Sequence, residues 1–164
     1  MDFILEFPTK EQARQICTIW EAGWHEAHAD IVPPELRGLR TAKSFSERTL
    51  RNLACTRVAR AGANVLGFCM IKENELFQMY VSRQARGSGV AQALIQDAVS
   101  RISAAGHKTA WLACAIGNER AARFYERSGW TNAGQQVVDL DTSEGTFALE
   151  VWRFEKHLST SGAG

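Results

Sequence analysis

The sequence predicts an α/β fold, in which a mixed, mostly antiparallel central sheet is flanked by helices in a single domain. Apolar residues alternate in some segments and recur at three- and four-residue steps in others, and the two kinds of segment are interleaved. In addition, 164 residues with 45% hydrophobic content are enough for one self-supporting core. We expect this domain to span residues 1–158, followed by a flexible polar tail at residues 159–164.

The N-terminal part is expected to form a short edge strand and a long helix. Phe3–Phe7 has the pattern of a strand and is stopped by Pro8. Thr9 and Gln12 have the spacing of a capping box, in which two side chains satisfy free amides at a helix start. Apolar residues follow at helical spacing, so the helix is predicted over Lys10–His28.

A loop and a second helix are expected next. The loop contains Pro33 and Pro34, and Ser44 with Glu47 forms a second capping-box pattern ahead of a helix over Phe45–Leu53. We interpret this irregular segment as a substrate lid.

Three strands joined by tight turns follow in the middle of the chain. They are predicted over Arg57–Ala61, Val65–Lys72 and Glu75–Val81. Because side chains alternate along a strand, we expect two distinct faces on the third strand. One face would carry Glu75, Phe77, Met79 and Val81, and the other Leu76, Gln78 and Tyr80.

The C-terminal half is predicted to contain two helices and three strands. Apolar residues at three- and four-residue steps run from Ala91 to Ile102, and Gly106 ends that helix. The remaining elements, a strand, a helix and two strands, are predicted over Thr109–Ala115, Asn118–Ser128, Trp130–Val138 and Thr146–Phe154.

Composition argues against several classes of protein. Nineteen basic against eighteen acidic residues give a net charge of +1, which disfavours binding nucleic acid through bulk phosphate neutralisation. No stretch approaches the roughly 20 apolar residues that cross a membrane, and the N-terminus lacks the features of a signal peptide. The four cysteines lack metal-ligand spacing, so we expect reduced thiols, no metal site and a cytoplasmic location.

The segment from Tyr80 to Ala91 predicts a phosphate site. A strand leads into a glycine-containing turn that opens directly onto a helix, and such a turn directs unpaired backbone N–H groups toward one point. Gly87 and Gly89 let a ligand approach the backbone, and Arg86 adds a positive charge. The spacing matches neither the Walker loop nor the complete dinucleotide motif, so the glycines alone do not identify the ligand.

A second segment, about thirty residues later, narrows the ligand class. Asn118 begins a helix that contains Tyr125 and ends just before the pair Gly129-Trp130. Together with Gln84–Gly89, which has the pattern (Q/R)xxGx(G/A) after a strand, this segment resembles the GNAT superfamily of acyl-CoA-dependent N-acyltransferases. Both motifs match in order and spacing, and the resemblance is specific over about residues 65–130.

The resemblance implies a GNAT-like fold with splayed central strands that bind acetyl-CoA. The main chain of Met79 and Val81 would pair with the pantetheine arm like an added strand. Asn118, which also suits the N-cap of its helix, would hold the arm from the other side, and Tyr125 would lie near the sulfur. The backbone that would bind the pyrophosphate is that of Arg86, Gly87, Ser88, Gly89, Val90 and Ala91.

Acyl transfer needs a proton acceptor, because an aliphatic amine is protonated at neutral pH and must lose a proton before it attacks a thioester. Glu75 is our first choice, since many members of the superfamily carry a glutamate near this position. Glu73 takes its place if the strand contains a bulge that shifts the register. His25 and His28, with Glu26, are the third choice.

The other catalytic roles also follow from the chemistry. The resemblance implies the N–H of Met79 as the donor to the oxyanion, and the phenol of Tyr125 is suited to protonate the departing thiolate. Cys114 lies in an apolar strand with no adjacent base, so we interpret it as a buried small hydrophobe rather than a nucleophile. No covalent enzyme intermediate is needed.

Three residues near the end of the first helix are predicted to contact the acceptor substrate. Trp24, His25 and His28 precede the loop with Pro33 and Pro34, the segment that usually shapes the acceptor pocket in this superfamily. With no third ligand in range, we do not expect the two histidines to bind a metal.

The sequence therefore predicts an N-acetyltransferase of EC class 2.3.1 that transfers the acetyl group of acetyl-CoA to a primary amine of a small molecule or protein in a ternary complex. The alternatives are a non-catalytic acyl-CoA-binding sensor module and a nucleotide-binding domain. We expect neither nucleic acid nor a membrane as a partner. The sequence leaves open a homodimer formed through the C-terminal strands.

Overall fold

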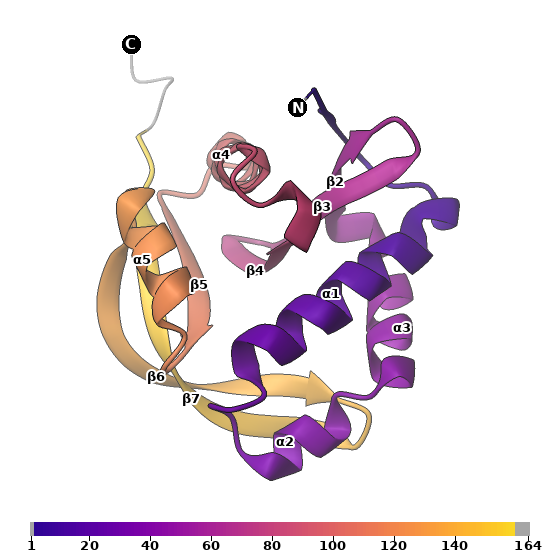
Figure 1. Ribbon diagram of the computed structural model, residues 1–164. Helices are drawn as coiled ribbons and strands as arrows, with labels where there is room; N and C mark the ends of the chain where they lie inside the picture. Colours follow the sequence, from indigo (N-terminus) through magenta and orange to yellow (C-terminus); the bar gives the residue numbers. More distant parts are fainter. Residues whose placement is uncertain (1, 160–164) are drawn as a thin grey trace.

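The computed structural model describes residues 2–159 and contains one seven-stranded sheet (Figure 1), with the strand order β1-β2-β3-β4-β5-β7-β6. All neighbouring strands are antiparallel except β4 and β5, which run parallel. In chain order the elements are β1 (Ile4–Glu6), α1 (Ala13–His28), α2 (Pro34–Leu39), α3 (Ala42–Arg51), β2 (Thr56–Ala61), β3 (Asn64–Lys72), β4 (Glu75–Val81), α4 (Val90–Ala104), β5 (Thr109–Ala115), α5 (Glu119–Arg127), β6 (Thr131–Thr142) and β7 (Gly145–His157).

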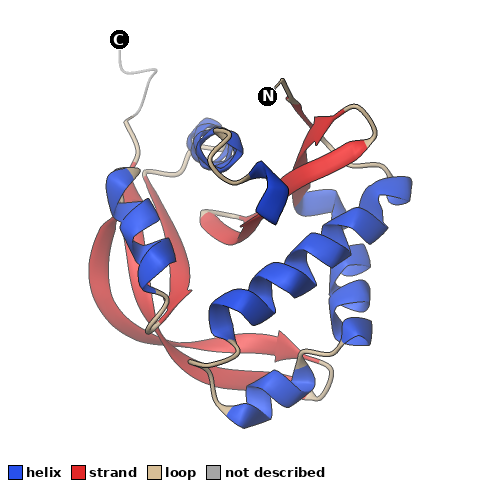
Figure 2. Cartoon of the chain, in the orientation of Figure 1, coloured by secondary structure: helices blue, strands red, loops and turns tan. Residues whose placement is uncertain are grey.

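Helices cover both faces of the sheet, as predicted (Figure 2). On one face, α4 and α5 pack against a cluster that includes Leu94, Leu112 and Phe154. On the other face, α1, α2 and α3 contribute to a second cluster, in which Trp20 and Phe45 are fully buried. The prediction of an α/β domain with a mixed, mostly antiparallel sheet is confirmed.

A β-bulge in β4 changes which side chains share a face. Met70 pairs with Gln78 and Ile71 pairs with Leu76, so Phe77 is the extra residue in β4. Leu76 therefore joins Met79 and Val81 in the cluster under α4, whereas Phe77 turns toward the cluster under α1. The predicted alternation along this strand is wrong, because it assumed a regular pleat.

The segment between α1 and β2 is more helical than predicted. Pro34 begins α2 inside the expected loop, where its missing N–H costs nothing at a first helical turn. The N-cap of α3 is Thr41, whose side chain accepts a hydrogen bond from the Ser44 N–H at 3.1 Å. The predicted helix start at Phe45 with Ser44 as its cap is therefore wrong.

Other boundaries lie close to the predictions. The first helix begins with a 3-10 turn over Lys10–Gln12, and the Thr9 N–H donates to Oε1 of Gln12 at 2.8 Å. The hairpin of β6 and β7 is longer than expected and bends around to reach α2 and α3 (Figure 1). Apart from Ser159, the predicted tail lies outside the described residues, and the domain boundaries stay predictions. Within residues 2–159 no helix is long and apolar enough to cross a membrane.

Candidate active site

The central strands β4 and β5 separate soon after they meet. They pair at one position, Glu75 with Trp111, where the Trp111 N–H donates to the Asn74 carbonyl at 3.1 Å. Beyond this point a cavity of about 780 Å³ lies between the strands. Residues from the end of α1, the turn before α4 and the start of α5 complete its walls.

The edge of β4 that faces the cavity has free main-chain groups. The Ser82 N–H donates to the Leu66 carbonyl of β3 at 2.8 Å. Because backbone groups alternate between the two edges of a strand, those of Met79 and Val81 are directed away from β3, toward β5. Both residues line the cavity, and β5 does not pair with them. This edge can therefore accept an extended ligand as a further strand.

The turn between β4 and α4, residues 82–89, has the geometry of an anion site. Gly87 and Gly89 have φ angles of +78° and +90°, which side chains rarely adopt, and nothing lies within 4 Å of a Cβ built at either position. The first helical hydrogen bond of α4 runs from the Ala93 N–H to the Gly89 carbonyl at 3.0 Å. The preceding amides of α4, which lack helical partners, belong to Val90, Ala91 and Gln92.

Two other amides of this turn are already used within it. The Arg86 N–H donates to the Arg83 carbonyl and the Ser88 N–H to the Ala85 carbonyl, both at 3.3 Å. These bonds are long, and they leave the Gly87, Gly89 and helical amides as the better donors to an anion.

Glu26, near the end of α1, connects this turn to the opposite wall. Its carboxylate accepts two hydrogen bonds from the Arg86 guanidinium, at 2.9 and 2.8 Å, and lies 3.5 Å from Arg83 and 3.9 Å from Arg120 of α5. Hydrogen bonding to Arg86 lowers the pKa of Glu26 to about 2. Arg86 thus has a protein partner, and Glu26 stays ionised at neutral pH.

Tyr125, Cys114 and Asn118 come together on the β5–α5 side of the cavity. The Tyr125 ring packs against Trp130 and Phe154, and burial raises the pKa of its phenol. The Asn118 side chain caps α5 by accepting from the Ala121 N–H at 3.4 Å, which leaves its NH₂ group available for a ligand.

Cys114 has the properties of a structural thiol. It is 4% exposed, and burial raises the pKa of its thiol to about 12. Since a thiol must ionise to act as a nucleophile, this environment disfavours a covalent acyl-enzyme. All four cysteines, Cys17, Cys55, Cys69 and Cys114, are free.

His28 is the histidine that lines the cavity, and its ring is fixed in one orientation. Its Nδ1 lies 3.0 Å from the Trp24 carbonyl, which can only accept, so Nδ1 carries the proton. Burial lowers the pKa of His28 to about 4, with smaller contributions from the charges of Arg40 and His25. At neutral pH the imidazole is therefore uncharged, and its Nε2 lone pair is free to accept a proton.

The other predicted base and acceptor residues lie outside the cavity wall. Glu75 stands at the closed end of the splay, where burial raises the pKa of its carboxyl, and Glu73 occupies the turn before β4. Trp24 and His25 pack with Phe45 in the cluster under α1. The structure brings Met79, Tyr125 and the glycine turn together with His28, and does not bring Glu75, Glu73, Trp24 or His25 to the same surface.

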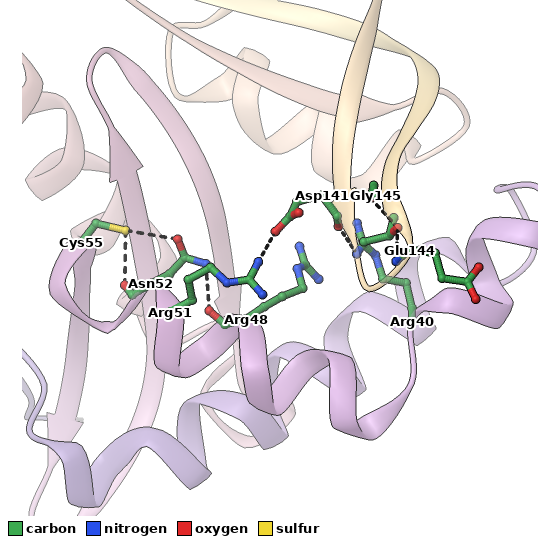
Figure 3. A network of polar contacts seen from close by, with 9 residues as sticks. Arg40, Arg48, Arg51, Asn52, Cys55, Asp141, Glu144 and Gly145 are labelled. Carbon is green, nitrogen blue, oxygen red and sulfur yellow. Dashed lines mark hydrogen bonds and ion pairs between the residues drawn. The ribbon is translucent and has the colours of Figure 1, made fainter.

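Two buried arginines near the tip of the β6–β7 hairpin were not predicted as site residues. Arg40 and Arg48 are 3% and 5% exposed, and they face the tip of the β6–β7 hairpin (Figure 3). The available signal is the position of Arg48 three residues after Phe45, on the apolar face of α3, where a charged residue is unexpected. Among the described residues, no three His, Cys, Asp or Glu side chains form a metal site.

Comparison with known proteins establishes the family. The model of the acetyltransferase (GNAT) family matches residues 14–130. The chain therefore belongs to this family and is an acetyltransferase of EC class 2.3.1, as the two motifs predicted.

Solved structures show the same fold over nearly the whole chain. An N-acetyltransferase from Rhodopseudomonas palustris has a TM-score of 0.73 at 20% identity, with 96% of this chain and 97% of that one covered. The PaiA N-acetyltransferase from Thermoplasma acidophilum, in complex with coenzyme A, has a TM-score of 0.68 at 18% identity, with 96% of this chain and 99% of that one covered. YncA from Salmonella typhimurium, with acetyl-CoA, has a TM-score of 0.71 at 14% identity, with 100% of this chain and 98% of that one covered.

Proposed function

We propose that this enzyme transfers the acetyl group of acetyl-CoA to a primary amine by direct attack in a ternary complex. The observation that carries the proposal is the splay of β4 and β5, which leaves main-chain groups of Met79 and Val81 and the amides at the start of α4 facing one cavity. An extended arm that ends in a pyrophosphate matches this arrangement of donors and acceptors. The solved relatives that contain coenzyme A or acetyl-CoA support the same ligand.

Within this proposal, His28 takes the proton of the amine. It lines the cavity and presents an unprotonated Nε2, whereas the Glu26 carboxylate is held by Arg86. A base with a pKa of about 4 is too weak to deprotonate an ammonium ion, so the acceptor reacts as the neutral amine, after its first proton has been released to solvent. His28 takes the next proton from this nitrogen once the N–C bond has formed, when the nitrogen has become acidic.

Tyr125 supplies the second proton. As the C–S bond breaks, the thiolate takes the phenol proton, and the Met79 N–H stabilises the oxyanion in the step before. The raised pKa of Tyr125 keeps the phenol protonated over the working pH range, as this role requires.

The proposal is tested by binding and turnover measured on the same protein. We expect acetyl-CoA and coenzyme A to raise the melting temperature, because a ligand at 100 times its Kd adds about 2.7 kcal/mol of stability, and ATP and NAD to have no such effect. A panel of amines with thiol-release detection then identifies the acceptor. Acetyl-CoA binding without turnover of any amine would instead support the acyl-CoA sensor, and stabilisation by ATP or NAD alone would contradict the proposed function.

A further inference from the structure

We infer that Arg40 and Arg48 form a subsite for the carboxylate of a small amine, so that the acceptor is an amino acid or a similar amino carboxylate. The inference rests on the proposed function, because it names the substrate class of the same cavity. It depends on two observations: the arginines are buried without enough hydrogen-bond partners, and they lie near Tyr80 and His28, at the end of the cavity that we assign to the acceptor.

Arg48 is a buried cation without a polar partner. No hydrogen bond or ion pair joins its guanidinium to another residue within 2–159, and its Nη1 is fully buried without a hydrogen-bond partner. The guanidinium stacks 4.3 Å from the centre of the Trp20 ring and 5.8 Å from that of Phe45. These contacts stabilise a cation but accept none of its N–H groups, so Arg48 keeps its donors for something else.

Arg40 leaves part of its hydrogen-bonding capacity unused as well. Its Nη1 donates to the Asp141 carbonyl at 2.6 Å, and its Nε is buried without a partner. The Asp141 carboxylate is paired with Arg51 instead (Figure 3). Of the three guanidinium groups near Asp141, only that of Arg51 pairs with its carboxylate, so the excess positive charge lies on the two buried arginines.

The charge of Arg48 persists at neutral pH despite its surroundings. Burial and the like charge of Arg40 lower the pKa of Arg48 to about 9. Burying two neighbouring cations destabilises a protein unless an anion joins them, and within residues 2–159 no free carboxylate does so. A small anion bound between them would remove this cost.

Tyr80 and His28 connect the arginine pair to the cavity. Both line the cavity, and Tyr80 packs so closely on α1 that a Cβ at Gly23 would lie 2.5 Å from its ring. The arginines themselves do not line the cavity. Arg48 stacks on Trp20, and ring contacts continue from Trp20 to Phe68 at 5.9 Å and from Phe68 to Tyr80 at 6.0 Å. In agreement with this proximity, the charges of both arginines partly offset the rise in pKa that burial causes at Tyr80. A carboxylate at the arginines therefore places the attached amine on the side of His28 and the splayed strands.

The enclosure of the pair indicates a small acceptor. α2, α3 and the β6–β7 tip surround the two arginines, which are together almost inaccessible to solvent. A lysine side chain of a folded protein carries no carboxylate near its amine. The geometry therefore favours a free amino carboxylate over a protein substrate.

The test compares matched acceptors in wild type, Arg48→Met and the control Lys43→Met, which removes an exposed cation from the same helix. The panel pairs free amino acids with their carboxamides and adds aminoethyl phosphate and a lysine-containing peptide. We expect at least one amino acid to exceed its amide by about 100-fold in kcat/KM, since loss of one partner of a buried charge pair has an effect of this size. In Arg48→Met this preference should fall below about tenfold through a higher KM, with the Kd of acetyl-CoA unchanged, whereas Lys43→Met should retain it.

A purely structural Arg48 gives a different result. Arg48→Met would then lower the melting temperature and reduce the rates with acid and amide equally, which would overturn the inference. Preference for the amides, the peptide or aminoethyl phosphate over every amino acid would also overturn it.

A binding measurement keeps the subsite testable apart from turnover. We expect an amino acid at about 10 mM to raise the melting temperature of the coenzyme A-treated wild type more than its amide does, and Arg48→Met to lose this difference. No stabilisation by any amino acid would contradict the subsite. If acetyl-CoA fails to bind, the proposed function fails, while amino acid stabilisation that depends on Arg48 still supports the subsite.

Discussion

The two ends of the cavity are built in different ways. The end that we assign to the cofactor presents main-chain groups of one continuous segment, from Met79 through the glycine turn to the start of α4. The end that we assign to the acceptor has side chains from α1, α3, β4 and the residue after α2, enclosed by a hairpin about a hundred residues later in the chain, as the contact between Arg40 and Asp141 shows. A local backbone motif can therefore serve a ligand common to a whole family, while side chains of dispersed origin can vary with the acceptor.

The largest effect should come from Tyr125→Phe, on the β5–α5 side of the cavity. Loss of a general acid lowers kcat by about 100-fold or more, and the Kd of acetyl-CoA should change less than about twofold, since the hydroxyl acts on the leaving group. Steady-state kinetics and calorimetry on the same variant measure both. A variant with normal kcat would remove Tyr125 from the chemistry.

At the acceptor end, the lowered pKa of His28 should make the stability of the protein depend on pH. Folding lowers the pKa of His28 from 6.5 to about 4, so the unfolded chain binds the proton more readily and stability falls as the pH falls from 6.5 toward 4. Between pH 7.5 and 5 this loss is about 2 kcal/mol, and His28→Asn should abolish it. Denaturant unfolding of wild type and variant at both pH values measures this loss. If the variant loses as much unfolding free energy between pH 7.5 and 5 as wild type does, the prediction is contradicted.

At the cofactor end, Glu26→Gln should strengthen binding. Glu26 places a negative charge beside the turn that we assign to pyrophosphate, and it occupies Arg86. Its neutralisation should lower the Kd of acetyl-CoA by about three- to tenfold at low salt, with a smaller gain at high salt. Glu21→Gln, on the same helix, is the matched control. Weaker binding in the Glu26 variant would mean that the carboxylate positions Arg86 for the ligand.

The smallest effect is expected from Cys114→Ala. The thiol lines the cavity but is protonated at neutral pH, so its removal should change kcat by less than about twofold. A loss of about 100-fold, together with an acetylated protein in a mass spectrum, would require a covalent intermediate.

The same contrast explains what the sequence could predict. The cofactor turn lies within a short segment, so the spacing of Gln84, Gly87 and Gly89 and the helix led by Asn118 were sufficient to predict the family and the fold. Local patterns also located most strands and helices to within a few residues.

The acceptor end could not be predicted in this way. The bulge at Phe77 depends on pairing with β3, and it reverses the face of every preceding residue in β4. Arg40, Arg48 and the β6–β7 tip meet only in the folded chain, and which histidine reaches the cavity depends on how α1 packs on Tyr80. Long-range packing sets these features, and no local pattern encodes it.

The most direct test of the account is a calorimetric titration of acetyl-CoA into the double variant Gly87→Asn, Gly89→Asn. Asparagine tolerates positive φ angles, so the turn can keep its shape while two side chains occupy the space in front of its amides. Gly106→Asn, with a φ of +97° at the other end of α4, is the matched control. We predict a Kd at least 100-fold weaker for the double variant and within about twofold of wild type for the control. Unchanged acetyl-CoA binding by the folded double variant would contradict the assignment of the site.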